Sequence, residues 1–229
     1  MAWNNPFSPD RIFEVLDVAG VQAGSRVLDV GCGTGELLVA LGRRGVTGVG
    51  IDRDPDAVAR AHAASAGLDV AFVAGDAAEE LPQGPFSLVA CLGAAHAFGS
   101  GNAALPAALE ALRDRAPGGH LLVGEGYQRR PLPPEYARFL GQPTGIDRTL
   151  ADLVDQCEGL GLSCVHAVTA SEAEWDAFEW AHFRRQRARA AALPRAEADA
   201  LLTRAHAWRE AWLQWGREAM GFALVLLET

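Results

Sequence analysis

The chain has 229 residues, of which 49% are hydrophobic and 21% charged, an ordinary composition for a globular protein with a sizeable core. Its 20 basic and 29 acidic residues give a formal net charge of -9, which argues against nonspecific binding to nucleic acid or anionic membranes. Every basic residue is Arg, so lysine-nucleophile and Schiff-base chemistry are excluded. We expect one domain with an elaboration.

The Cys residues and the first residues of the chain indicate the cell compartment in which we expect the protein. The four Cys residues form no CxxC pair and have no His at zinc-finger spacing, which predicts reduced thiols and no metal. The first residues lack a secretory pattern, and no apolar run approaches the roughly 18 residues of a membrane span. We therefore expect a cytoplasmic protein, as a monomer or homodimer. The Lys-free, Ala-rich composition suggests a GC-rich bacterial genome.

Short apolar runs alternate with helical stretches along the first half of the chain. Ser8-Pro9-Asp10 predicts a helix start, and that helix ends at Gly20. Because strands that alternate with helices form parallel sheets covered on both faces, we expect an α/β fold. The expected strands are 26–30, 46–51, 69–74, 86–91 and 120–124, and the expected helices are 36–44, 55–66 and 103–115.

The second half continues this alternation with two interruptions. A helix at 150–160 and strands at 162–168 and 222–227 are expected. The stretch 126–148 is rich in Pro and Arg, with a possible short helix at 135–140. The stretch 171–217 is about two helices long and lies before the last strand.

The most informative motif is the glycine-rich sequence VLDVGCGTGE at 27–36, where a strand turns sharply into a helix. Glycines there let the backbone approach a ligand and direct amide groups toward it. A phosphate-binding P-loop requires Lys, which the chain lacks. A dinucleotide loop prefers GxGxxG, but Glu36 stands in place of the third glycine and would repel an anion. The loop therefore favours a ligand with an amino acid end and an adenosine but no phosphate.

Two further acidic residues fit such a ligand. Asp52 closes the second expected strand, where its carboxylate can accept hydrogen bonds from both ribose hydroxyls. Asp76 follows the third strand, where a carboxylate and a backbone amide can read an adenine edge.

With these residues the chain resembles the class I S-adenosylmethionine (SAM)-dependent methyltransferases, in their small-molecule (type 11/25-like) branch. The resemblance spans roughly residues 8–126 and rests on the order and spacing of its motifs. It implies a Rossmann-like fold with a seven-stranded, mostly parallel sheet and an antiparallel last strand, and SAM as the cofactor. The matching segments are LDVGCGTG (28–35), GIDRD (50–54), AGDA (74–77), FSLVACLGAAHAFG (86–99) and APGGHLLVGEG (116–126).

The resemblance also implies which residues surround the cofactor. Asp29 and Gly31 would hold its methionine end, although Asp29 could serve only to fix the loop. Arg53 would flank the adenine, or else be solvated. The expected cofactor-binding residues are Asp29, Gly31, Cys32, Gly33, Gly35, Asp52, Arg53, Asp76, Ala77, Leu92 and Gly93.

Methyl transfer from a sulfonium requires alignment of the acceptor and, where the acceptor is protonated, a base. His96, in the loop after the fourth strand, is one candidate; its alternative role is to bond loop backbone. Glu125, at the end of the fifth strand, is another, and could instead bond a neighbouring loop. Tyr127 is a third candidate, as a hydroxyl donor to the acceptor.

The helical insertion holds five of the six Trp residues. Its apolar faces can pack on the core, and some of its aromatics can line an acceptor pocket. The expected substrate residues are Trp175, Phe178 and His182. In related enzymes such an insertion folds over the carboxyl edge, so we expect 171–217 to form a lid on a core of 8–170 and 218–229.

The sequence therefore predicts an enzyme that moves a methyl group from SAM to an O or N atom of a small molecule, releasing S-adenosylhomocysteine (SAH). The loop after the fourth strand lacks the Asn-Pro-Pro-aromatic signature of base-flipping adenine methyltransferases, which disfavours DNA substrates. Two alternatives remain open: a SAM-binding regulator without turnover, and a nicotinamide dehydrogenase.

Overall fold

A computed structural model describes residues 3–141 and 147–229. Within them lies a seven-stranded sheet of order β3-β2-β1-β4-β5-β7-β6, in which only β7 runs against the other strands. This topology confirms the predicted fold class. The strands are β1 (Arg26–Val30), β2 (Thr47–Asp52), β3 (Val70–Ala74), β4 (Leu88–Leu92), β5 (His120–Gln128), β6 (Ser163–Thr169) and β7 (Met220–Glu228).

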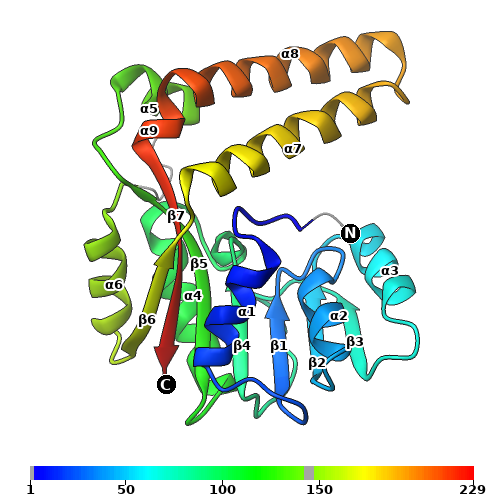
Figure 1. Cartoon of the computed structure of the whole chain (residues 1–229), viewed down its shortest axis with the longest axis vertical. Coiled ribbons are helices and arrows are strands. Elements are labelled where there is room, and N and C mark those ends of the chain that lie inside the picture. The colour runs from blue at the N-terminus through cyan, green and yellow to red at the C-terminus, as the bar shows by residue number, and fades with distance from the viewer. Residues whose placement is uncertain (1–2, 142–146) are drawn as a thin grey trace.

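Helices cover both faces of the sheet (Figure 1). One buried cluster joins the sheet to α1 (Pro9–Val18), α2 (Glu36–Gly42) and α3 (Pro55–Ala64). A second cluster joins the opposite face to α4 (Ala104–Leu112) and α6 (Leu150–Glu158). Because both faces are covered, β1 and β4 are almost wholly buried, and their buried positions are apolar except for Asp29.

Two helices begin with local side-chain contacts. The hydroxyl of Ser8 accepts a hydrogen bond from the Arg11 amide, with Pro9 at the first helical position. A capping box between Ser171 and Glu174 begins the long helix of the insertion. The signal at Ser8 and Pro9 explains why that helix start could be read from the sequence.

The insertion forms an antiparallel helix pair, α7 (Glu172–Ala190) and α8 (Arg195–Ala211). The pair lies beyond the carboxyl ends of the parallel strands, with α5 (Pro134–Leu140) beside it (Figure 1). A π-helical turn, Trp212–Gly216, and the short α9 (Arg217–Ala219) lead back into β7. No helix in the described parts of the chain is long and apolar enough to span a bilayer.

Candidate functional site

The glycines of the loop between β1 and α2 differ in their surroundings. One is packed against neighbouring side chains, and another faces an open crevice. Gly31, Gly33 and Gly35 all have positive φ angles, of 72°, 53° and 80°. A Cβ on Gly35 would lie within 2.8 Å of Phe72 and Ala61, so this glycine is needed for the packing of α2 against its neighbours. A Cβ on Gly33 would meet no atom within 4 Å. Gly33 therefore faces free space.

That space is a cavity of about 510 Å³ at the carboxyl ends of the strands, beside the switch point between β1 and β4. Ten of the eleven expected cofactor-binding residues line it. Gly35 does not line it, because it is buried against Phe72 and Ala61. The ten are Asp29, Gly31, Cys32, Gly33, Asp52, Arg53, Asp76, Ala77, Leu92 and Gly93.

Carboxylates dominate the charge of this cavity. Asp29, Glu36, Asp52 and Asp76 line it, against the guanidinium groups of Arg53 and Arg185. Asp29 is 5% exposed, and its carboxylate has no hydrogen-bond partner in the described structure. Burial, followed by the charges of Glu36 and Asp52, raises its pKa to about 7. A buried acid without a partner, in an acidic cavity, suits a ligand that brings positive charge.

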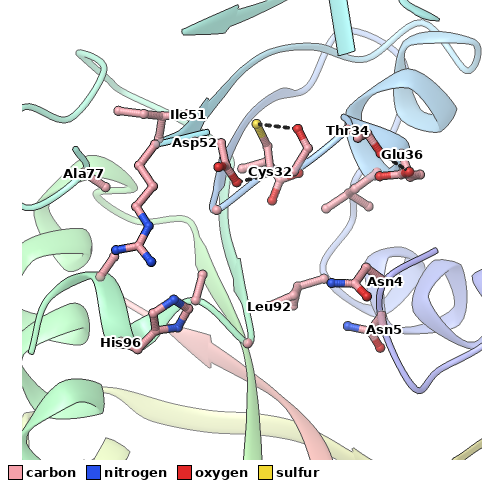
Figure 2. A pocket seen from close by; sticks show the side chains of 18 of the residues that line it. Asn4, Asn5, Cys32, Thr34, Glu36, Ile51, Asp52, Ala77, Leu92 and His96 are labelled. Carbon is pink, nitrogen blue, oxygen red and sulfur yellow. Dashed lines mark hydrogen bonds between the residues drawn. The ribbon is translucent and has the colours of Figure 1, made fainter. Parts of the chain in front are cut away.

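Asp52 and Asp76 stand where the sequence places them, at the ends of β2 and β3. One Asp52 oxygen accepts a hydrogen bond of 2.8 Å from the Gly33 amide, and the other accepts one of 2.9 Å from the Asp54 amide. Figure 2 shows Asp52 and Cys32 on one side of the cavity, facing Leu92 and His96 on the other. Ribose hydroxyls bound here would donate hydrogen bonds to a carboxylate that these two backbone amides already orient.

A second cavity, of about 430 Å³, adjoins the first. The two share a boundary formed by Asn4, Asn5, Leu92, Gly93 and His96. Six Phe, Trp or Tyr side chains line the second cavity. The aromatic residues are Tyr136, Trp175, Phe178, Trp208, Trp212 and Phe222.

His96 lies on the shared boundary, within a short 3-10 helix at Ala95–Ala97. Its side chain is exposed and makes no hydrogen bond to any residue that the structure describes. The imidazole is thus free to meet a group in either cavity. Of the expected acid–base residues, it has the most open position.

Glu125 lines the second cavity as half of an ion pair. Its Oε2 accepts a hydrogen bond of 2.7 Å from Nη2 of Arg148, a side chain only 4% exposed. Burial raises the pKa of Glu125, and the attraction of Arg148 opposes that shift. Arg148 also donates to Gln156 at 3.4 Å. The pair leaves one Glu125 oxygen without a partner within the described residues.

Besides Gly35, two expected site residues lie outside both cavities. Tyr127 is 7% exposed and packs on Gly221, because β5 continues to Gln128 and carries this ring into the core beside β7. His182 faces the contact between α7 and α8, where its Nε2 lies 3.2 Å from the Gln186 amide nitrogen. Trp175 and Phe178, by contrast, line the second cavity with their rings 6.4 Å apart.

Several lining residues gave no usable signal in the sequence. Asn4 and Asn5 precede the first helix, and only the folded chain brings them to the boundary, where Arg185 donates a hydrogen bond of 3.3 Å to Asn4. Arg148 lies in an irregular segment, and Glu179 is one of several acids on α7, with no local pattern to set it apart. Across 3–141 and 147–229, no cluster of three or more His, Cys, Asp or Glu residues could hold a metal ion.

Comparison with known proteins places this geometry in a family. Residues 27–119 match a family model described as a methyltransferase domain. Over 192 residues the chain is 33% identical to the uncharacterized protein YjhP of Escherichia coli K12, covering 80% of this chain and 76% of YjhP. Ubiquinone biosynthesis O-methyltransferase of Pseudomonas aeruginosa is 42% identical over 90 residues, which cover 37% of this chain and 38% of that protein.

The solved structures agree. A SAM-dependent methyltransferase from Thiobacillus denitrificans, crystallised with SAH, is 30% identical and superposes with a TM-score of 0.86 over 99% of this chain and 94% of that one. The chain belongs to the class I SAM-dependent methyltransferases, as its motifs predicted, and SAM is its cofactor.

The first cavity fits that cofactor. The unpartnered carboxylate of Asp29 can pair with an ammonium group, Gly33 leaves room beside the loop, and the excess of acids suits a cationic sulfonium. When bound, SAM supplies an already activated methyl group.

Proposed function

We propose that this enzyme methylates an O or N atom of a small molecule held in the second, aromatic cavity. The observation that carries the proposal is the shared boundary, where the cavity of the cofactor motifs opens onto the aromatic one at Leu92, Gly93 and His96. An acceptor in the second cavity would face a methyl donor in the first. A volume of about 430 Å³ suits a small organic molecule.

The acidic chain and the enclosed cavity both favour a small acceptor over a polymer. A formal charge of -9 disfavours DNA and anionic membrane surfaces as partners. The α7–α8 pair contributes Trp175, Phe178 and Trp208 to the cavity, so it would serve as the lid that excludes water. Trp175 and Phe178 remain our proposed substrate residues.

We assign His96 as the group that takes a proton from a protonated acceptor, since it stands at the boundary with its ring nitrogens unengaged. Glu125 would act beside it as an orienting carboxylate, because Arg148 already engages one of its oxygens. The ten lining residues would hold the donor, with Asp29 toward its ammonium, Asp52 toward its ribose and Asp76 toward its adenine.

The test is turnover with a panel of small acceptors. Purified enzyme and SAM are incubated with phenols, carboxylic acids and amines, and both SAH release and product mass are measured. We expect a product heavier by one methyl group for at least one small acceptor. Tight SAM binding without turnover across the panel would favour the regulator, and turnover only on DNA or protein would contradict the small-molecule assignment.

A further inference from the structure

One buried carboxylate of the aromatic cavity has no cationic partner. Glu179, in the middle of α7, is 9% exposed and lines the cavity. Its Oε2 accepts a hydrogen bond of 2.8 Å from the indole Nε1 of Trp208 on α8. No Arg or His forms an ion pair with it in the described structure. Buried acids are rarely left in this state, because an uncompensated charge is costly away from water.

Other charges of the cavity do not compensate Glu179. Arg148 is the lining guanidinium, and it is engaged by Glu125 at 2.7 Å. That pair is neutral as a unit. Burial raises the pKa of Glu179, and the single bond from Trp208 only partly opposes that rise. The negative charge of Glu179 is therefore the unbalanced charge in this space.

Aromatic rings surround the same space. Trp175 stacks on Trp212 with ring centres 5.4 Å apart and planes 22° from parallel. Tyr136, Phe178 and Trp208 complete the wall around the acid. The faces of such rings carry negative potential and attract organic cations, indole most strongly. A carboxylate and several indoles in one cavity are complementary to an ammonium group on an apolar body.

We propose that the acceptor of this enzyme is a small organic amine, whose ammonium group pairs with Glu179 among the indole rings. This inference rests on the proposed function and names the substrate class for it. Glu179 acts in recognition, as the anchor of the amine, while the methylated atom lies toward the boundary at His96.

Binding of three matched probes tests the inference without requiring turnover. Benzylamine, benzyl alcohol and benzoate have similar shapes but carry positive, zero and negative charge. Each is titrated calorimetrically into the enzyme saturated with SAH. We expect benzylamine to bind at least about tenfold more tightly than benzyl alcohol, and benzoate more weakly still. Equal binding of the three, preference for benzoate, or no measurable binding of benzylamine at millimolar concentration would overturn the inference.

Glu179→Gln isolates the charge, since its amide oxygen can still accept the bond from Trp208. We expect this variant to lose the preference for benzylamine and to melt no lower than the wild type. Glu197→Gln, which removes an exposed charge from α8, is the matched control and should keep the preference. Retention of the preference in Glu179→Gln would overturn the assignment of Glu179.

Turnover then separates this inference from the proposed function. Methylation of phenols or carboxylic acids that lack an amino group, but not of acceptors that carry one, would contradict the inference and leave the proposed function standing. Absence of turnover on every small acceptor would contradict both the inference and the proposed function.

Discussion

The carboxylate of Asp52 accepts a hydrogen bond of 2.8 Å from the backbone amide of Gly33, and so joins the end of β2 to the glycine loop after β1. The same carboxylate is the proposed partner of the cofactor ribose. One side chain thus contacts the loop and, in the proposed assignment, the ligand as well.

Replacement of Asp52 should therefore weaken donor binding. We expect Asp52→Ala to lower the affinity for SAH by about 1–3 kcal/mol, because hydrogen bonds to the ribose and to Gly33 are both lost. Calorimetry measures this directly. Asp69→Ala, at the opposite end of β3, removes the same charge and should leave the affinity unchanged. Equal affinity in Asp52→Ala and the wild type would show that the ribose lies elsewhere.

The two glycines Gly33 and Gly35 should respond differently to a methyl group. Gly35→Ala would press a Cβ against Phe72 and Ala61 at positive φ, so we expect a loss of several kcal/mol in the free energy of unfolding. Gly33→Ala has room and should cost only about 1 kcal/mol of stability, yet weaken SAH binding because the methyl group enters the crevice. Urea unfolding and calorimetry on both variants make the comparison; similar effects on stability would contradict it.

Asp29 should make both stability and donor binding depend on pH. Its pKa rises from 3.8 in the unfolded chain to about 7 in the fold, so the protonated form stabilises the ligand-free protein. That stability is complete below pH 3.8 and is lost as pH rises through 7. The stability of Asp29→Asn should not fall in this way as the pH rises. The variant should therefore have a higher melting temperature than the wild type at pH 8.

Donor affinity should change in the opposite direction. Only ionised Asp29 pairs with an ammonium group, so SAH affinity should rise between about pH 6 and pH 7.5, by up to about tenfold per pH unit below the pKa. Asp29→Asn should bind more weakly and lack this component. Parallel pH profiles for the two proteins, measured by calorimetry, would contradict the assignment.

The Arg148–Glu125 pair should matter more than an exposed pair of similar length. Arg148→Met leaves Glu125 buried and unpaired, which should cost about 3–5 kcal/mol of stability in urea unfolding. Glu125→Gln combined with Arg148→Met should recover part of that loss. As a control, Arg130→Met breaks an exposed pair with Glu218 and should cost less than about 1 kcal/mol. Comparable losses in the two single variants would contradict the account.

Loss of the His96 imidazole should slow turnover without weakening the binding of the methyl donor. We expect His96→Ala to reduce kcat about 100-fold or more on an acceptor that must lose a proton, with SAH affinity unchanged. His166→Ala, on the edge strand β6, is the control and should retain full activity. Full turnover in His96→Ala would remove it as a base.

The cofactor side of the site could be predicted because its signals are local. Asp29, Asp52 and Asp76 lie within two residues of the carboxyl ends of the parallel strands β1, β2 and β3, and such strands place these ends on one edge of the sheet. The different surroundings of Gly33 and Gly35 could not be predicted, because a packed glycine and one that faces a cavity look alike in the sequence.

Fewer residues of the acceptor cavity could be predicted from the sequence, because segments that are distant along the chain form that cavity. Glu179 and Arg148 meet the cavity through the placement of α7 and of the loop before α6, which no local pattern fixes. Tyr127 was expected at the edge because β5 was predicted to end at 124, whereas pairing with β7 extends it to Gln128. Helical spacing grouped His182 with Trp175, but that ring faces α8.

The central claim is that the donor's sulfur faces the aromatic cavity across the boundary of Leu92, Gly93 and His96. A crystal structure of the complex with SAH tests it most directly. The account predicts the adenosine beside Asp52 and Asp76, the amino acid end beside Asp29, and the sulfur open to the cavity walled by Trp175 and Phe178. A nucleoside bound within the aromatic cavity, or a sulfur turned away from the boundary, would contradict it.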